Sequence, residues 1–188
     1  MRDDEPDFDE LLDLLPATGA IPGDLLSVET EAHFATCLVC KLSLADRNYA
    51  ILKDIRSNEC VLECAICTGC IEDMHESYSE ESRLAMTRFA ARGVELLLDS
   101  NGQLAEDAEN RCELCASRLE GIEEYSVRAF CRGHSLLDRG VVCTKCENEM
   151  QDCLSKSTRD ERDGFIERHF PGLPGEFSPM PDLIPIFG

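Results

Sequence analysis

The sequence predicts an α+β protein made of two duplicated small zinc-stapled modules, each with a cysteine knuckle, a β-hairpin, a second knuckle and two helices. Three observations predict this fold. A set of four cysteines occurs twice, a longer repeat surrounds it, and within each repeat short strand-like runs give way to helix-like spacing of apolar residues. The predicted divisions are an acidic, flexible arm (1–30), zinc module 1 (31–95), a linker (96–111), zinc module 2 (112–170) and a proline-rich tail (171–188).

The cysteines occur as Cys-x2-Cys pairs that are separated by nearly equal lengths of chain. Twenty-six residues separate the first two pairs and twenty-seven separate the second two. Two such pairs, roughly 15–30 residues apart, have the spacing of a closed tetrahedral zinc site. We therefore expect two Zn²⁺ ions per chain, with the ligands Cys37, Cys40, Cys67 and Cys70 in module 1 and Cys112, Cys115, Cys143 and Cys146 in module 2.

The repeat extends well beyond the cysteines. Leu44 corresponds to Leu119 at an offset of 75 residues, and after a one-residue gap Tyr49 corresponds to Tyr125 at an offset of 76. Thirteen positions are identical in the two copies, where about three or four identities are expected by chance at average composition. This self-similarity indicates a true duplication and determines the predicted architecture.

Short strands are expected after the first knuckle of each copy. The runs 49–52 and 125–127 are rich in aromatic and β-branched residues, and so are their partners 61–62 and 141–142. Turn-forming residues lie between the runs of each copy, which predicts one hairpin in each module.

Two helices are expected after the second knuckle of each copy. Apolar residues four apart predict a short first helix, and Ser79 and Ser155 stand where the N-cap of a second helix belongs. We expect Phe89 and Phe165 to pack each second helix back onto its own module.

A knuckle, a hairpin and a helix that supplies the last two ligands resemble the treble-clef zinc finger. The resemblance covers residues 37–78 and 112–154, and the cysteine spacing is its specific motif. This group includes LIM, RING and ribosomal-protein fingers and has no single activity. The resemblance therefore implies structural zinc and says nothing about a substrate.

Four cysteines lie outside the repeat, and whether they bind metal is open from the sequence: Cys60, Cys64, Cys131 and Cys153. Including two of them produces a set that resembles a RING finger, a ubiquitin-ligase module: Cys37, Cys40, Cys60, Cys64, Cys67, Cys70, Cys112 and Cys115. That assignment leaves Cys143 and Cys146 without a metal and ignores the repeat.

The small size of each repeat favours stabilisation by a metal. A module of about sixty residues is marginal on an apolar core alone, and the chain has no Trp and only 6% aromatic residues. Structural zinc supplies roughly 10–16 kcal/mol in zinc-finger peptides, which exceeds what such a core contributes.

The formal net charge of −20 argues against generic binding to nucleic acid, because contacts to phosphates need cations. It favours a protein partner, possibly a basic one. Residues 112–170 hold 12 acidic and 9 basic residues, a net charge of −3. Nucleic-acid binding through module 2 is therefore the alternative, using Arg128, Arg132, Arg139, Lys145 and Arg159 if they share a face.

No catalytic constellation is identifiable. Cys131 and His134 lie three apart on a predicted turn without an orienting group, and no phosphate-binding loop or paired-carboxylate motif is present. We expect no secretory signal, because the start of the chain is acidic, and no apolar run is long enough to span a membrane. We expect a cytoplasmic, non-catalytic adaptor whose partner, pathway and oligomeric state the sequence leaves open.

Overall fold

The computed structural model describes residues 8–99, 101–105 and 107–171. Its centre is one antiparallel sheet with the strand order β1-β5-β4-β2-β3. The strands are β1 (Gly19–Ala20), β2 (Asn48–Arg56), β3 (Glu59–Cys67), β4 (Tyr125–Arg132) and β5 (Ser135–Cys143). The predicted α+β class is confirmed, and both predicted hairpins are present as β2–β3 and β4–β5.

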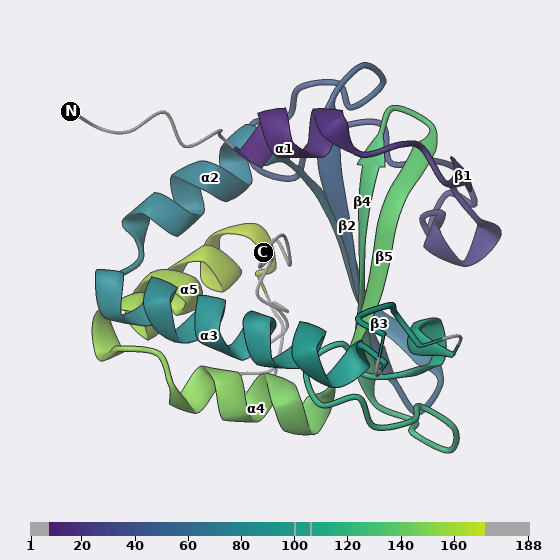
Figure 1. Cartoon of the computed structure of the whole chain (residues 1–188). Coiled ribbons are helices and arrows are strands. Elements are labelled where there is room, and N and C mark those ends of the chain that lie inside the picture. Colours follow the sequence, from purple (N-terminus) through teal and green to yellow (C-terminus); the bar gives the residue numbers. More distant parts are fainter. Residues whose placement is uncertain (1–7, 100, 106, 172–188) are drawn as a thin grey trace.

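Helices cover one side of this sheet. Figure 1 shows α2 to α5 gathered on that side, α1 across one end of the sheet, and β1 beside β5. The helical segments are α1 (Phe8–Leu14), η1 (Gly23–Leu25), α2 (Thr68–Ser77), α3 (Glu80–Leu97), η2 (Ala108–Asn110), α4 (Thr144–Asp152) and α5 (Lys156–His169). Among the described residues, none of these helices is long and apolar enough to cross a bilayer.

The two repeats meet along their first strands and are related by an approximate twofold axis. β2 and β4 pair antiparallel, and Leu52 lies opposite Arg128, its own counterpart in the repeat. Both hairpins carry an irregularity at the same place, between Asp54 and Ile55 and between Phe130 and Cys131. Because an isolated two-stranded hairpin is only marginally stable, this pairing gives each repeat the neighbouring strand that it lacks.

The same axis passes between the starts of α3 and α5. The hydroxyl of Ser79 accepts the amide of Ser82, and that of Ser155 accepts the amide of Thr158, so both predicted N-caps are confirmed. The two capping oxygens lie 2.9 Å apart. Each cap is also held by the opposite repeat, because Ser79 N–H donates to Thr158 Oγ1 at 3.1 Å and Ser155 N–H donates to Ser82 Oγ at 2.9 Å.

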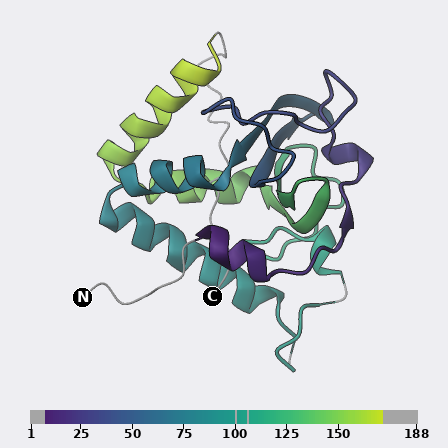
Figure 2. The ribbon, with the colours of Figure 1, turned by 90° about the horizontal axis from the view of Figure 1, so that it is seen from above.

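The second helices are exchanged between the repeats, which corrects the expectation that each packs on its own module. Met86 and Ala90 of α3 belong to an apolar cluster whose other buried members, apart from Tyr78, come from repeat 2. Phe165 of α5 belongs to the larger cluster, which includes Cys37 and much of repeat 1. The reason is the contact between the two caps: each second helix starts at the axis and continues across it. Figure 2 shows α3 and α5 starting close together and running apart.

The described part of the predicted arm, residues 8–30, lies on the domain. Phe8 packs edge-on against Phe130 with ring centroids 5.3 Å apart, and Leu12 is fully buried. Farther along, Gly19 and Ala20 form β1 on the edge of β5. The tail from 172 onward lies outside the described residues.

Candidate metal centres

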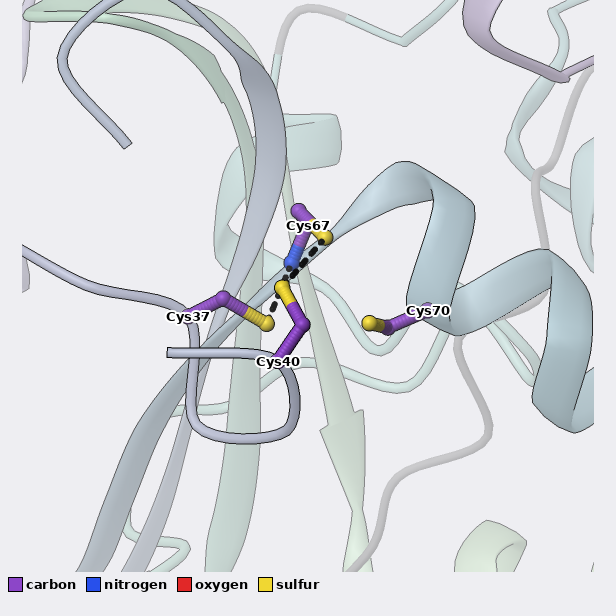
Figure 3. Close-up of side chains that lie close together, drawn as sticks. All are labelled: Cys37, Cys40, Cys67 and Cys70. Carbon is purple, nitrogen blue, oxygen red and sulfur yellow. Dashed lines mark hydrogen bonds between the residues drawn. The ribbon is translucent and has the colours of Figure 1, made fainter. Parts of the chain in front are cut away.

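The first group of four cysteines is assembled from a knuckle and the start of α2. A left-handed residue, Lys41, closes the knuckle, and its amide donates to the carbonyl of Cys37 at 3.0 Å. Cys67 is the N-cap of α2 and Cys70 lies in its first turn. The four Sγ atoms lie within 4.8 Å of one another, and Figure 3 shows them converging from the two elements.

The second group repeats this construction. Ala116 takes the left-handed conformation that Lys41 takes in the first group, and its amide donates to the carbonyl of Cys112 at 2.8 Å. Cys143 is the N-cap of α4, and its Sγ lies 3.9 Å from that of Cys115. Together with Cys146, these four sulfurs again lie within 4.8 Å of one another.

Both knuckles are tied to the sheet by equivalent backbone hydrogen bonds. The amide of Leu38 donates to the carbonyl of Ala65 at 2.8 Å, and that of Glu113 donates to Val141 at 2.9 Å. The acceptors lie two residues before Cys67 and Cys143. Each bond therefore holds the first cysteine pair of its group close to the second. The hairpin between the pairs therefore determines the distance between them.

Backbone amides donate to a sulfur at both centres. Cys37 Sγ accepts the amides of Val39 and Cys67, each at 3.4 Å, and Cys112 Sγ accepts that of Cys143 at 3.4 Å. Burial raises the pKa of Cys37, but these amides outweigh it and bring the pKa down to about 7. Thiolates are the form in which cysteine binds metal.

The two centres differ in how far solvent reaches them. Cys37 and Cys112 are both fully buried. In the first group, however, Cys40 is exposed, whereas its counterpart Cys115 is only half-buried and Cys146 is buried. The second centre is therefore the more enclosed of the two.

The cysteines outside the repeat take no part in either group. Cys64 and Cys131 are buried, and burial raises the pKa of each thiol to about 12, so both stay protonated. Cys60 is half-buried and Cys153 is exposed. The RING-like assignment is wrong in its grouping, because Cys112 and Cys115 join the later cysteine pair and no group of three or more ligands in the described chain includes Cys60 or Cys64.

Each of the five basic residues of repeat 2 that were expected to bind phosphates has a partner within the chain. Arg128 is buried and donates two hydrogen bonds to the carboxylate of Glu113, each at 2.8 Å. Three of the others form ion pairs, Arg132 with Asp13, Arg139 with Asp24 and Lys145 with Glu149, and Arg159 donates to the carbonyl of Leu154.

Two supporting positions escaped the sequence prediction. Thr68 and Thr144 follow directly after Cys67 and Cys143. The hydroxyl of Thr144 donates to the carbonyl of Glu124 at 3.0 Å, and that of Thr68 lies 3.2 Å from the carbonyl of Asn48. Each contact holds the helix that carries the second cysteine pair close to the strand start or loop ahead of its hairpin. The signal was present in the repeat, since this Thr is identical in both copies.

A polar depression of about 810 Å³ lies beside the first centre, next to Cys67. Its groups are already engaged with one another, because Asn48 donates to the carboxylates of Asp9 and Asp13 and Thr68 donates to Asp9. This network secures α1 to the sheet and accounts for the buried amide of Asn48.

Comparison of the chain with protein-family models, with curated proteins and with solved structures finds no match. The two four-cysteine groups, each able to hold one metal ion, therefore carry the functional argument, and they indicate a protein built from two metal-binding modules.

Proposed function

We propose that the protein is a non-catalytic interaction module held together by two structural Zn²⁺ ions in treble-clef-like centres. The observation that carries this proposal is that each centre has four cysteine sulfurs within 4.8 Å of one another. Four thiolates fill a tetrahedral shell, whereas catalytic zinc keeps one position for water or substrate.

The surroundings of the sulfurs support a structural role. In each group, one cysteine pair lies on a knuckle and the other at the end of a hairpin and the start of a helix. A bound metal would therefore link parts of the chain that are distant in sequence. Zinc suits such all-thiolate tetrahedral sites, and its binding energy adds directly to folding energy.

The charge of the chain supports a basic protein as partner. The net charge is −20, and two filled Zn(Cys)₄ centres make it more negative, because each combines four thiolates with one dication. The four arginines and the lysine considered for phosphate binding each have a partner within the chain, which argues against nucleic acid.

Metal analysis of the purified chain tests the structural part of the proposal. We expect about two zinc atoms per chain. Replacement by Co²⁺ should give the absorption of tetrahedral thiolate coordination. Cys143→Ser should remove one metal, whereas Cys153→Ser, at an exposed cysteine outside both groups, should retain both. Iron in place of zinc, or full zinc content in Cys143→Ser, would contradict the proposal.

A further inference from the structure

The two outer edges of the sheet are equivalent in the repeat but differently covered. β5 carries β1 on its outer edge, with Gly19 opposite Leu136 and Ala20 opposite Ser135. In the repeat, Ser135 corresponds to Glu59 and Leu136 to Cys60 of β3. Within the described part of the chain, β3 is the last strand of the sheet and pairs with β2 alone.

The backbone at the open edge has the same orientation as at the covered one. Leu136 lies opposite Cys131 of β4, and its carbonyl accepts the amide of Thr18 from the arm at 2.8 Å. Cys60 lies opposite Ile55 in the same register, next to the same irregularity. The N–H and C=O of Cys60 therefore point away from β2, as those of Leu136 point away from β4.

The side chains around this edge leave it accessible. Glu59 is exposed, Val61 is 36% exposed and Cys60 is half-buried. The knuckle covers β3 only farther along, where Leu38 bonds Ala65. An open edge without Pro or Lys is a template for another strand.

The charge beside the open edge is negative. Glu59 on β3 itself is exposed, and so are two acids near this end of the strand: Glu29, whose amide lies 3.5 Å from the carboxylate of Glu63 in β3, and Glu123 in the loop before β4. The Ser57–Asn58 turn that begins β3 is joined to this acidic loop, because Asn58 N–H donates to the carbonyl of Glu123 at 3.4 Å. The nearby cations are already paired, Lys53 with Glu63 at 3.1 Å and Arg56 with Asp54 at 3.0 Å and with Glu124 at 3.2 Å.

We propose that the outer edge of β3 at Glu59–Val61 binds an extended, basic peptide segment of a partner protein, which adds a strand to the sheet as β1 does at β5. Strand addition of this kind obtains affinity from main-chain hydrogen bonds and specificity from the flanking side chains. A second copy of this chain is disfavoured as occupant, because it would bring the same carboxylates and another charge of −20 to the edge. This inference rests on the proposed function as an interaction module, and it identifies the surface of the protein that would bind the partner.

The test is fluorescence anisotropy with a labelled peptide, Lys-Lys-Thr-Gly-Ala-Ile-Lys-Lys, which places the four residues of the Thr18–Ile21 segment between lysines. The full zinc-loaded chain should bind it saturably. Cys60→Pro removes the outward N–H without removing a bond to β2, and should weaken binding about ten-fold or more. Glu59→Lys should weaken it about three- to ten-fold through charge, whereas Glu109→Lys, an exposed acid in η2 beside β5, should leave it unchanged.

A second probe and a control measurement separate the possible failures. The same peptide with N-methyl groups on alternate pairing amides should lose binding, which keeps the test valid if Cys60→Pro folds poorly. Absence of binding by the wild type overturns the inference. So does a result in which Cys60→Pro binds the peptide as tightly as the wild type does and the wild type binds the methylated peptide as tightly as the unmethylated one. Protection of the Cys60 amide from hydrogen exchange in the free monomer also overturns it, since this chain's own residues would then cover the edge. So does a wild-type dimer that Cys60→Pro converts to monomer. Zinc content, measured on the same samples, reports on the metal centres independently.

Discussion

At the scale of single residues, Tyr49 shows how a buried polar group joins the two repeats. Its side chain is 1% exposed, and its hydroxyl donates to the carbonyl of Gly133, in the turn of the other hairpin, at 2.8 Å. Burial raises the pKa of this phenol above its usual range, so it stays a donor. The counterpart Tyr125 is only half-buried. The same residue type therefore acts differently in the two copies.

Tyr49→Phe should lower the free energy of unfolding by about 1–3 kcal/mol, because the buried carbonyl of Gly133 loses its donor. Tyr125→Phe is the matched control and should change stability by less than about 0.5 kcal/mol, as expected away from buried networks. Urea unfolding at constant zinc measures both. Equal effects of the two substitutions would show that the bond to Gly133 adds nothing.

A second residue-scale prediction concerns His75 in α2. Burial lowers its pKa to about 4, and the charge of Arg83 acts in the same direction. The unfolded chain therefore binds a proton near pH 6.5 that the folded chain does not bind, and stability decreases as the pH falls from 6.5 toward 4. Between pH 7.5 and 5.5 the wild type should lose about 1 kcal/mol more than His75→Leu.

The comparison with His75→Leu is needed because acid also protonates the metal-binding thiolates. That effect is common to both proteins and cancels in the difference of their unfolding free energies at constant zinc. Parallel pH profiles for the two proteins would mean that His75 keeps an ordinary pKa in the folded state.

At the scale of elements, the crossing of α3 over the second knuckle depends on a glycine. A Cβ atom at Gly93 would lie 2.1 Å from the carbonyl oxygen of Glu113 and 2.9 Å from Cα of Leu114. Both are backbone atoms beside Cys112 and cannot move without displacing the metal centre. The absence of a side chain at Gly93 therefore allows a helix of repeat 1 to rest on the knuckle of repeat 2.

Gly93→Ala should destabilise the protein by about 1–3 kcal/mol through this overlap. Gly164→Ala, inside α5, is the control: its Cβ would meet only the end of the Arg168 side chain at 3.4 Å. That substitution should stabilise by about 0.5–1 kcal/mol, the usual gain for Ala over Gly in a helix. Thermal melts of the zinc-loaded proteins measure both effects. If Gly93→Ala left the melting temperature unchanged, the result would argue against the exchanged packing.

At the scale of the whole molecule, the repeats pack as one unit, and we expect them to unfold together. They share a sheet through β2 and β4, and each contributes a helix to the apolar cluster centred on the other. Loss of one metal should therefore unfold more than the repeat that binds it. Structural zinc contributes roughly 10–16 kcal/mol, which is as large as the total stability of an ordinary domain.

Cys112→Ser should lower the hydrogen-exchange protection of β2 as well as that of β4, although β2 belongs to the repeat with an intact centre. Cys153→Ser is the control and should keep both strands protected, since this cysteine lies outside the groups. Two separate melting transitions in Cys112→Ser, with β2 still protected, would show instead that the modules fold independently.

Much of the local structure was predictable because its causes lie close together in the chain. The grouping of the eight repeated cysteines, both hairpins and the caps at Ser79 and Ser155 follow from spacing and residue type. The duplication was visible in the sequence, and the pairing of Leu52 with Arg128 shows that an approximate twofold axis relates its two copies.

The exchanged helices were not predictable, for a physical reason. An apolar stripe that includes Phe89 or Phe165 shows that a helix buries one face, but two similar modules offer similar surfaces to bury it on. The ion pair of Arg128 with Glu113 likewise joins residues 15 apart whose approach depends on the knuckle resting on β5. Such contacts depend on surfaces that exist only once the sheet has formed.

The chain by itself thus determined its two four-cysteine groups, its duplicated plan and its hairpins, since a knuckle, a cap or a turn forms from neighbouring residues. Only the tertiary structure decided that the hairpins share one sheet, that α3 and α5 cross the axis, and that β1 covers one sheet edge while β3 stays open among the described residues. The reason is that burying apolar surface lowers the free energy whichever complementary surfaces meet. The residue pattern specifies which faces are apolar, but it does not specify their partners.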